Sequence, residues 1–188
     1  MISYIEPYDP KWKAEFEQIK KVLEDELKDL EICIEHIGST AVPGLFAKPI
    51  LDIDIIIGRE GVLGLITSRL EKLGYQTKGE QGIEGRFAFG QVSDHVPFTN
   101  PIQKSVAHHL YVCYSDSLAL KNHLLFRDAL IKDANLVVEY SALKKLLVED
   151  LNISREEYQR KKTDFIISVL KGAGLMNTEL DQIKGANT

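Results

Sequence analysis

The stretch that decides the fold is HIGSTAVPGLFAKPILDID, residues 36–54, which leads from one predicted strand through a loop into another. Residues 50–57, ILDIDIII, form a β-branched run that predicts a buried central strand. Asp52 and Asp54 lie two residues apart in this strand, so both side chains point to the same face. An otherwise apolar strand therefore carries two neighbouring acids.

A pair of acids on one face of a buried strand indicates a cation. The two carboxylates repel each other and are costly to remove from water without compensation. Mg²⁺ or Mn²⁺, which prefers oxygen ligands and usually brings substrate phosphates, meets this need. We therefore take Asp52 and Asp54 as candidate catalytic metal ligands. The alternative is that they cap the strand end and accept hydrogen bonds from loop amides.

The loop before this strand favours phosphate binding. Residues 38–49 are interrupted by glycine and proline and predict a loop with at most a short helical turn. Gly38 allows close approach of the backbone to a phosphate, and the Ser39 hydroxyl offers a further bond. Thr40 completes this candidate phosphate-binding turn. Taken alone, the same residues also fit an ordinary turn.

Three basic residues are further candidates for nucleotide or phosphate binding. Lys48 precedes the acid pair and could contact either the acids or a phosphate. Arg86 stands in a glycine-rich turn, where its planar guanidinium suits a phosphate or a carboxylate. Arg127, in a predicted helix, could close the site or bridge to Glu or Asp.

A third catalytic carboxylate is missing from the strand where it is expected. Residues 107–113, AHHLYVC, predict a strand, and its alternation places Ala107, His109, Tyr111 and Cys113 on one face. We expect His109 to face the acids as a metal ligand, proton carrier or phosphate partner. The alternative is a strand histidine bonded to a neighbouring backbone group, and a bulge would reverse the parity.

The remaining pattern predicts an α/β protein with a mixed sheet flanked by helices and a helical C-terminal third. The further elements expected are a helix over 11–30, a strand over 31–37, a helix over 61–73, a hairpin over 75–92, and helices over 117–132, 134–148 and 154–171. We divide the chain into an α/β core over 1–115, helices packed on it over 116–174, and a mobile tail over 175–188.

Composition limits the classes of function. The chain has 188 residues, 44% of them hydrophobic, and a net charge of -5, so no extended nucleic acid is expected as a partner. Cys33 and Cys113 have no metal-ligand spacing and are interpreted as small buried residues in a reducing compartment. No apolar run is long enough to span a membrane, so a cytoplasmic location without membrane contact is expected.

Several motifs carry a resemblance to known proteins. One pattern resembles the signature of the nucleotidyltransferase superfamily, whose fold is polymerase-β-like. It consists of a strand, then Gly38-Ser39, a twelve-residue spacer and Asp52-Ile53-Asp54. The whole stretch 36–54 resembles the hallmark of the GrpB family. Further matches are Pro7-Tyr8-Asp9-Pro10 with Trp12, Gly82-Ile83 with Gly85-Arg86, His108 to Cys113, His123-Leu124, Phe126-Arg127-Asp128 and Tyr140 to Lys144.

This resemblance implies a nucleotidyltransferase-like fold without fixing a reaction. The family domain also occurs as an extension on some dephospho-coenzyme A kinases, which implies adenine nucleotides or coenzyme A precursors as ligands. We therefore expect a GrpB-like protein that binds Mg-nucleotide and transfers a nucleotidyl group to an unknown acceptor. The alternatives are a non-catalytic module for nucleotides or coenzyme A precursors, and a protein-interaction surface on the C-terminal helices.

Overall fold

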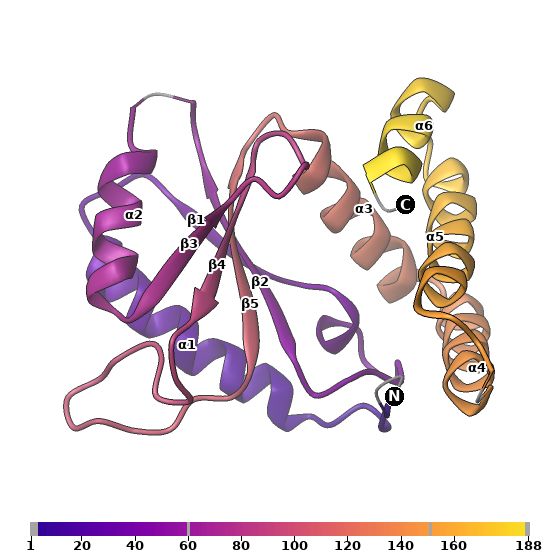
Figure 1. Ribbon diagram of the computed structural model, residues 1–188, viewed down its shortest axis with the longest axis horizontal. Coiled ribbons are helices and arrows are strands. Elements are labelled where there is room, and N and C mark those ends of the chain that lie inside the picture. The colour runs from indigo at the N-terminus through magenta and orange to yellow at the C-terminus, as the bar shows by residue number, and fades with distance from the viewer. Residues whose placement is uncertain (1–3, 60, 151, 187–188) are drawn as a thin grey trace.

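Five strands form one mixed sheet in the order β1-β2-β5-β4-β3 (Figure 1). The computed structural model describes residues 4–59, 61–150 and 152–186. The strands are β1 (Cys33–Ile37), β2 (Leu51–Ile57), β3 (Tyr75–Gly79), β4 (Arg86–Gln91) and β5 (His108–Tyr114). β2 and β5 pair in parallel, and the other neighbours are antiparallel. The predicted α/β class and mixed sheet are confirmed.

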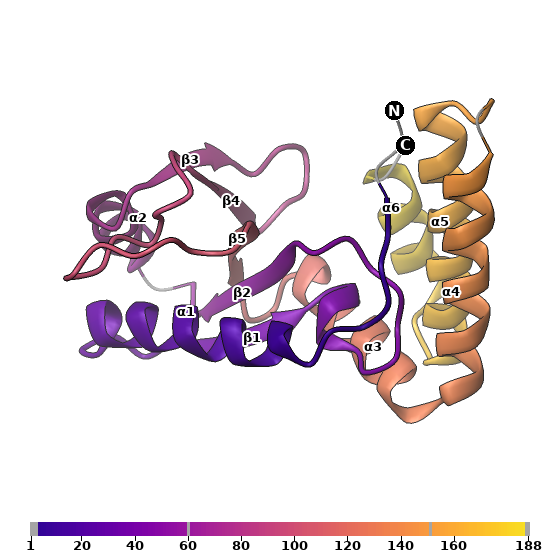
Figure 2. The same ribbon diagram turned by 90° about the horizontal axis from the view of Figure 1, so that it is seen from below.

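Two helices cover one face of this sheet. They are α1 (Lys11–Leu27) and α2 (Leu63–Lys72), and Figure 2 shows α1 running below β2 in that view. The apolar stripe of α1 is buried against Ile53 and Ile55 of β2, and it includes Trp12 and Phe16. Because this face is mainly apolar, every second residue of β2 is buried within it.

The C-terminal part forms a separate group of helices at one end of the sheet (Figures 1 and 2). They are α3 (Leu118–Lys132), α4 (Ala134–Glu149), α5 (Arg155–Gly172) and α6 (Asn177–Ala186). The first three were predicted from their apolar spacing. Among the helices that the structure describes, none is long and apolar enough to cross a membrane.

Two expectations from the sequence are corrected. The segment 175–188 was expected to be a mobile tail, but α6 packs its Leu180 and Ile183 into a buried cluster with Leu170. Residues 187–188 of that segment lie outside the described residues. Two apolar residues three apart are enough to bury one side of a short helix, although they give little periodic signal. Cys113 is buried as expected, whereas Cys33 is exposed because it begins the edge strand β1.

The strand register separates an apolar face from a polar one. His108 lies opposite Leu51 on the helix-covered side. It is 4% exposed, and its Nε2 lies 2.7 Å from the Tyr75 hydroxyl. Burial lowers the pKa of His108 to about 4. The folded protein therefore holds this histidine neutral at pH values where the unfolded chain protonates it.

We expect His108 to make stability sensitive to acid. Its folded pKa is below its ordinary value of 6.5, so its contribution is present above pH 6.5 and is lost as pH falls towards 4. The size of the shift corresponds to about 3 kcal/mol. Urea unfolding of wild type and His108→Gln at several pH values should show a shallower acid dependence in the variant. Equal slopes would contradict this assignment.

Candidate functional site

The acids of β2 lie on the polar face of the sheet, next to β5. The register places Asp52 opposite His109 and Asp54 opposite Tyr111. Asp52 Oδ1 lies 3.0 Å from His109 Nδ1, and this hydrogen bond raises the pKa of His109. The structure thus places His109 beside the acid pair, as the alternation predicted.

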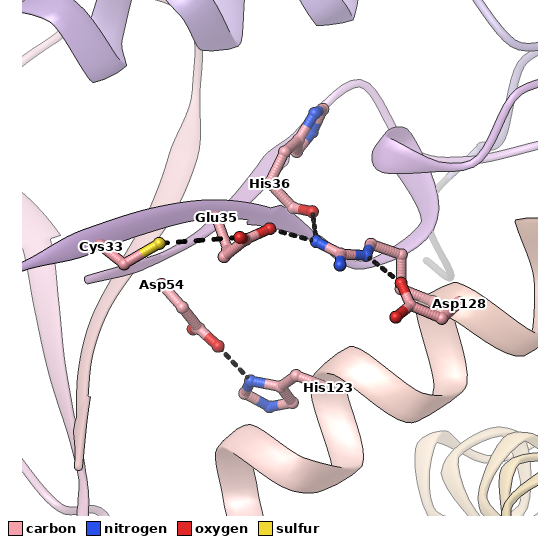
Figure 3. A network of polar contacts seen from close by, with 7 residues as sticks. Cys33, Glu35, His36, Asp54, His123 and Asp128 are labelled. Atoms are coloured by element: carbon pink, nitrogen blue, oxygen red, sulfur yellow. Dashed lines mark hydrogen bonds and ion pairs between the residues drawn. The ribbon is translucent and has the colours of Figure 1, made fainter. Parts of the chain in front are cut away.

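Asp54 is the most deeply buried polar group of the site. It is 0% exposed, and its Oδ2 lies 2.8 Å from Nδ1 of His123 on α3 (Figure 3). Its Oδ1 is also buried and has no hydrogen-bond partner among the described residues. A buried carboxylate oxygen without a partner is costly, and a bound cation would satisfy it. The residues present therefore fit a divalent ion.

His123 was not among the predicted site residues. It stands 69 residues from Asp54, on a helix whose apolar spacing gave no hint of a polar contact. The one available signal was its place in the GrpB-like motifs, since a histidine within that pattern had no other explanation. Its contact with Asp54 joins the C-terminal helices to the sheet.

Arg127 forms the bridge that was the alternative to phosphate binding. Its guanidinium donates to Glu35 Oε2 at 2.6 Å, to the His36 carbonyl at 2.9 Å and to Asp128 Oδ1 at 2.8 Å. Figure 3 shows these bonds tying α3 to β1. With three acceptors already in place, this arginine holds two elements together and has little freedom to bind a phosphate.

Gly38 brings the loop directly against the acid pair. Its φ of 70° lies in the left-handed region, and a Cβ built there would lie 2.2 Å from Asp52 Oδ2. The short 3-10 helix η1 (Ser39–Ala41) follows. The buried Thr40 hydroxyl lies 3.0 Å from the His36 ring, so Thr40 supports the turn from within. Glycine is required here both for its backbone and for its size.

Lysines from three segments, Lys48, Lys144 and Lys162, lie within electrostatic reach of one another, and Lys144 also contacts Ser39. Lys144 of α4 donates to the Ser39 hydroxyl at 3.1 Å, and burial followed by the nearby Lys162 lowers its pKa to about 7. Burial and then Lys48 lower the pKa of Lys162 on α5, while Asp52 acts in the opposite sense. Among the described residues, no ion pair to a carboxylate is seen for any of the three. Their positive charge is therefore available to an anion.

Sequence reasoning found one of these lysines and missed the other two. Lys48 was predicted because it precedes the acids in the chain. Lys144 and Lys162 come from helices whose periodicity indicated only packing, and only the fold brings them to the loop. Lys144 is only 3% exposed, which is unusual for a lysine and makes it a candidate site residue.

Arg86 lies at the other end of the site, away from Ser39. Its guanidinium stands 4.6 Å from the centre of the Tyr111 ring, and its buried Nε has no hydrogen-bond partner among the described residues. It lines a pocket of about 490 Å³ between β4, α3 and α6, which His123 also lines. The predicted residues thus fall into a group around Asp52 and a group around Asp54.

No third carboxylate stands free on the polar face among the described residues. β5 presents His109, Tyr111 and Cys113 on this face, as expected from its sequence. Glu35 of β1 lies opposite Asp54, but it is paired with Arg127. The polar face therefore carries the two acids beside strand residues that are not carboxylates.

The fold is nucleotidyltransferase-like. A solved structure of the Cid1 poly(U) polymerase with MgGTP bound superposes with a TM-score of 0.56 at 18% identity, covering 81% of this chain and 46% of that one. At this identity the likeness concerns the fold alone. The crystal structure of conserved protein GrpB from Enterococcus faecalis has a TM-score of 0.73 at 31% identity, covering 90% and 96%.

The GrpB protein family profile matches residues 3–172, and the chain belongs to this family. The Glutamate-rich protein GrpB of Alkalihalophilus pseudofirmus is 30% identical over 162 residues, which cover 85% of this chain and 88% of that protein. The UPF0157 protein YqkA of Bacillus subtilis is 32% identical over 159 residues. That match covers 85% of this chain but only 43% of the length of YqkA.

The contact between Gly38 and Asp52 leads to a prediction. Gly38→Ala should displace the Asp52 carboxylate and abolish divalent-ion binding measured by isothermal titration. Gly44→Ala is the matched control, because Gly44 also has a positive φ of 80° but its nearest neighbour would lie 3.9 Å from an added Cβ. Gly44→Ala should lose about 1–2 kcal/mol from its positive φ, and Gly38→Ala should lose more, because its φ of 70° with ψ of -168° suits glycine alone and the added Cβ meets Asp52. Equal metal binding by the two variants would show that the contact is unimportant.

Proposed function

We propose that this protein binds a nucleoside triphosphate with Mg²⁺ and transfers the nucleotidyl group to an acceptor. The observation that carries the proposal is a group of three lysines near the acid pair, Lys144 bonded to Ser39 and Lys162 with Lys48 beside it, none of them paired with a carboxylate among the described residues. A triphosphate is the common biological anion that needs several positive charges on one side and a metal on the other.

Each group of residues has a part in this reaction. Asp52 and Asp54 would hold the cation, which supplies charge neutralisation at the reacting phosphate when bound. Ser39, Lys144 and Lys162 would bind the outer phosphates. An acceptor oxygen attacks the α-phosphorus, the bond to the bridging oxygen breaks, and pyrophosphate leaves. His109, bonded to Asp52 and partly exposed, is placed to take the acceptor proton.

A second function is favoured by one specific observation, the absence of a third free carboxylate on the polar face of the described residues. A protein with this site would bind a nucleotide or a coenzyme A precursor without turnover. Pyrophosphate release from a panel of triphosphates with candidate acceptors separates the two functions. Thermal melts with the same panel test binding, which both functions require.

We expect a ligand-dependent rise in melting temperature. At a ligand concentration near 100 times the dissociation constant the gain is about 2.7 kcal/mol, or roughly 5–10 °C for a domain of this size. Ser39→Ala removes a hydroxyl beside the charged phosphates and should weaken affinity roughly tenfold to a hundredfold. Asp52→Asn/Asp54→Asn should lose the magnesium dependence.

The control is Ser168→Ala on α5, where the hydroxyl donates only to the Phe165 carbonyl. This variant should keep the full ligand-dependent shift. If no nucleotide stabilises wild type, or if Ser39→Ala responds as wild type does, the phosphates do not bind at this turn.

The lowered pKa of Lys144 predicts pH-dependent binding. Lys144 loses its charge above pH 7 in the free protein, and a bound phosphate favours the charged form. Affinity should therefore fall about fivefold between pH 7 and pH 8. Lys144→Met should bind more weakly at pH 7 and lose most of this dependence. Isothermal titration at pH 7 and pH 8 measures the affinity of both proteins. If the affinity of the variant falls as much as that of wild type, the pH dependence comes from a group other than Lys144.

A further inference from the structure

A second group of possible metal ligands includes one member of the acid pair. It consists of Asp54 from β2, Cys113 from β5 and His123 from α3. One ligand atom from each residue lies within 4.8 Å of the other two. Oxygen, sulfur and nitrogen donors from three separate elements thus converge on one point.

The donor set differs in kind from that of the proposed magnesium site. Magnesium selects oxygen ligands, whereas a thiolate and an imidazole select zinc and similar transition metals. Cys113 is fully buried and Asp54 is 0% exposed, so the point where they meet is shielded from bulk water. The buried Asp54 Oδ1, which has no partner among the described residues, is an independent sign that a positive ligand is missing.

The pocket between β4, α3 and α6 adjoins this cluster through His123. His123 lines the pocket of about 490 Å³, and so does Arg86. Three protein ligands with a fourth position facing a pocket are typical of zinc sites that bind substrate or water, while closed structural sites have four protein ligands. The side of the cluster formed by His123 therefore faces space that a further ligand could occupy.

The charges around the cluster are also consistent with a divalent ion. The Asp54 carboxylate and a Cys113 thiolate would together neutralise a doubly charged cation. The pocket is also lined by Arg59, which is paired with Asp116, and by Glu84, while the buried Nε of Arg86 has no hydrogen-bond partner among the described residues. An anionic oxygen of a phosphate or carboxylate is the ligand that this arrangement suits best.

We propose that Asp54, Cys113 and His123 form a site for Zn²⁺ or a chemically similar transition metal, open to an anionic ligand in the adjoining pocket. Binding replaces the Cys113 thiol proton, which leaves to solvent, with a metal–sulfur bond. The site shares Asp54 with the proposed magnesium site, and one carboxylate can bridge two ions. It requires neither Asp52 nor a nucleotide, so it stands apart from the proposed transfer reaction.

Cobalt is the probe that tests it, because a cobalt–thiolate bond gives a charge-transfer absorption that oxygen or nitrogen ligands do not give. Chelator-treated full-length protein without nucleotide should develop this band on titration with Co²⁺, and Zn²⁺ should displace it. Cys113→Ser should abolish the band, and His123→Asn should weaken Co²⁺ binding by at least about tenfold. Cys33→Ser, which removes the exposed cysteine, should behave as wild type.

Two further comparisons make the outcome decisive. Asp52→Asn should keep the cobalt band while losing magnesium, and Cys113→Ser should keep the nucleotide-dependent thermal shift, so failure of this site and failure of the proposed function give different results. If Cys113→Ser does not fold, the wild-type and His123→Asn titrations decide the matter. Absence of the band in wild type, or its loss in Cys33→Ser, overturns the proposal.

Discussion

The parallel pairing of β2 with β5 is the constraint on which the rest of the structure depends. It sets Asp52 opposite His109 and Asp54 opposite Tyr111, and it turns the alternate residues of both strands into the apolar cluster under α1 and α2. A shift of one residue would send both acids into that cluster. The cost of burying two unpaired carboxylates there keeps the register in place, so the core specifies the geometry of the site.

The second determinant is the attachment of the C-terminal helices to the sheet. Asp54 with His123, and Glu35 with Arg127, fasten α3 to the polar face. Lys144 reaches Ser39 across 105 residues of sequence. The site is thus assembled at a boundary between two groups of elements, where side chains can be buried from both sides while a cleft remains open.

The sequence predicted the elements well because periodicity and glycine or proline boundaries are local properties. Asp52, Asp54 and His109 were placed on one face by alternation alone, and the pairing confirms that placement. His123, Lys144 and Lys162 could not be found in this way, since their positions depend on how helices far along the chain pack on the loop. Arg127 forms the bridge to an acid that was the alternative to phosphate binding. Its partner Glu35 is far away in the sequence, so only the folded structure could distinguish the two possibilities.

The position of Trp12 has a practical consequence for spectroscopy. It is the only tryptophan of the chain, and it is buried on α1 against the apolar face of the sheet. The acid pair and the lysines lie on the opposite face. Intrinsic fluorescence therefore reports the loss of the apolar core, and a ligand bound among the lysines cannot stack on the indole and quench it by contact. The fluorescence of Trp12 therefore reports unfolding of the core without direct contact between the indole and a bound ligand.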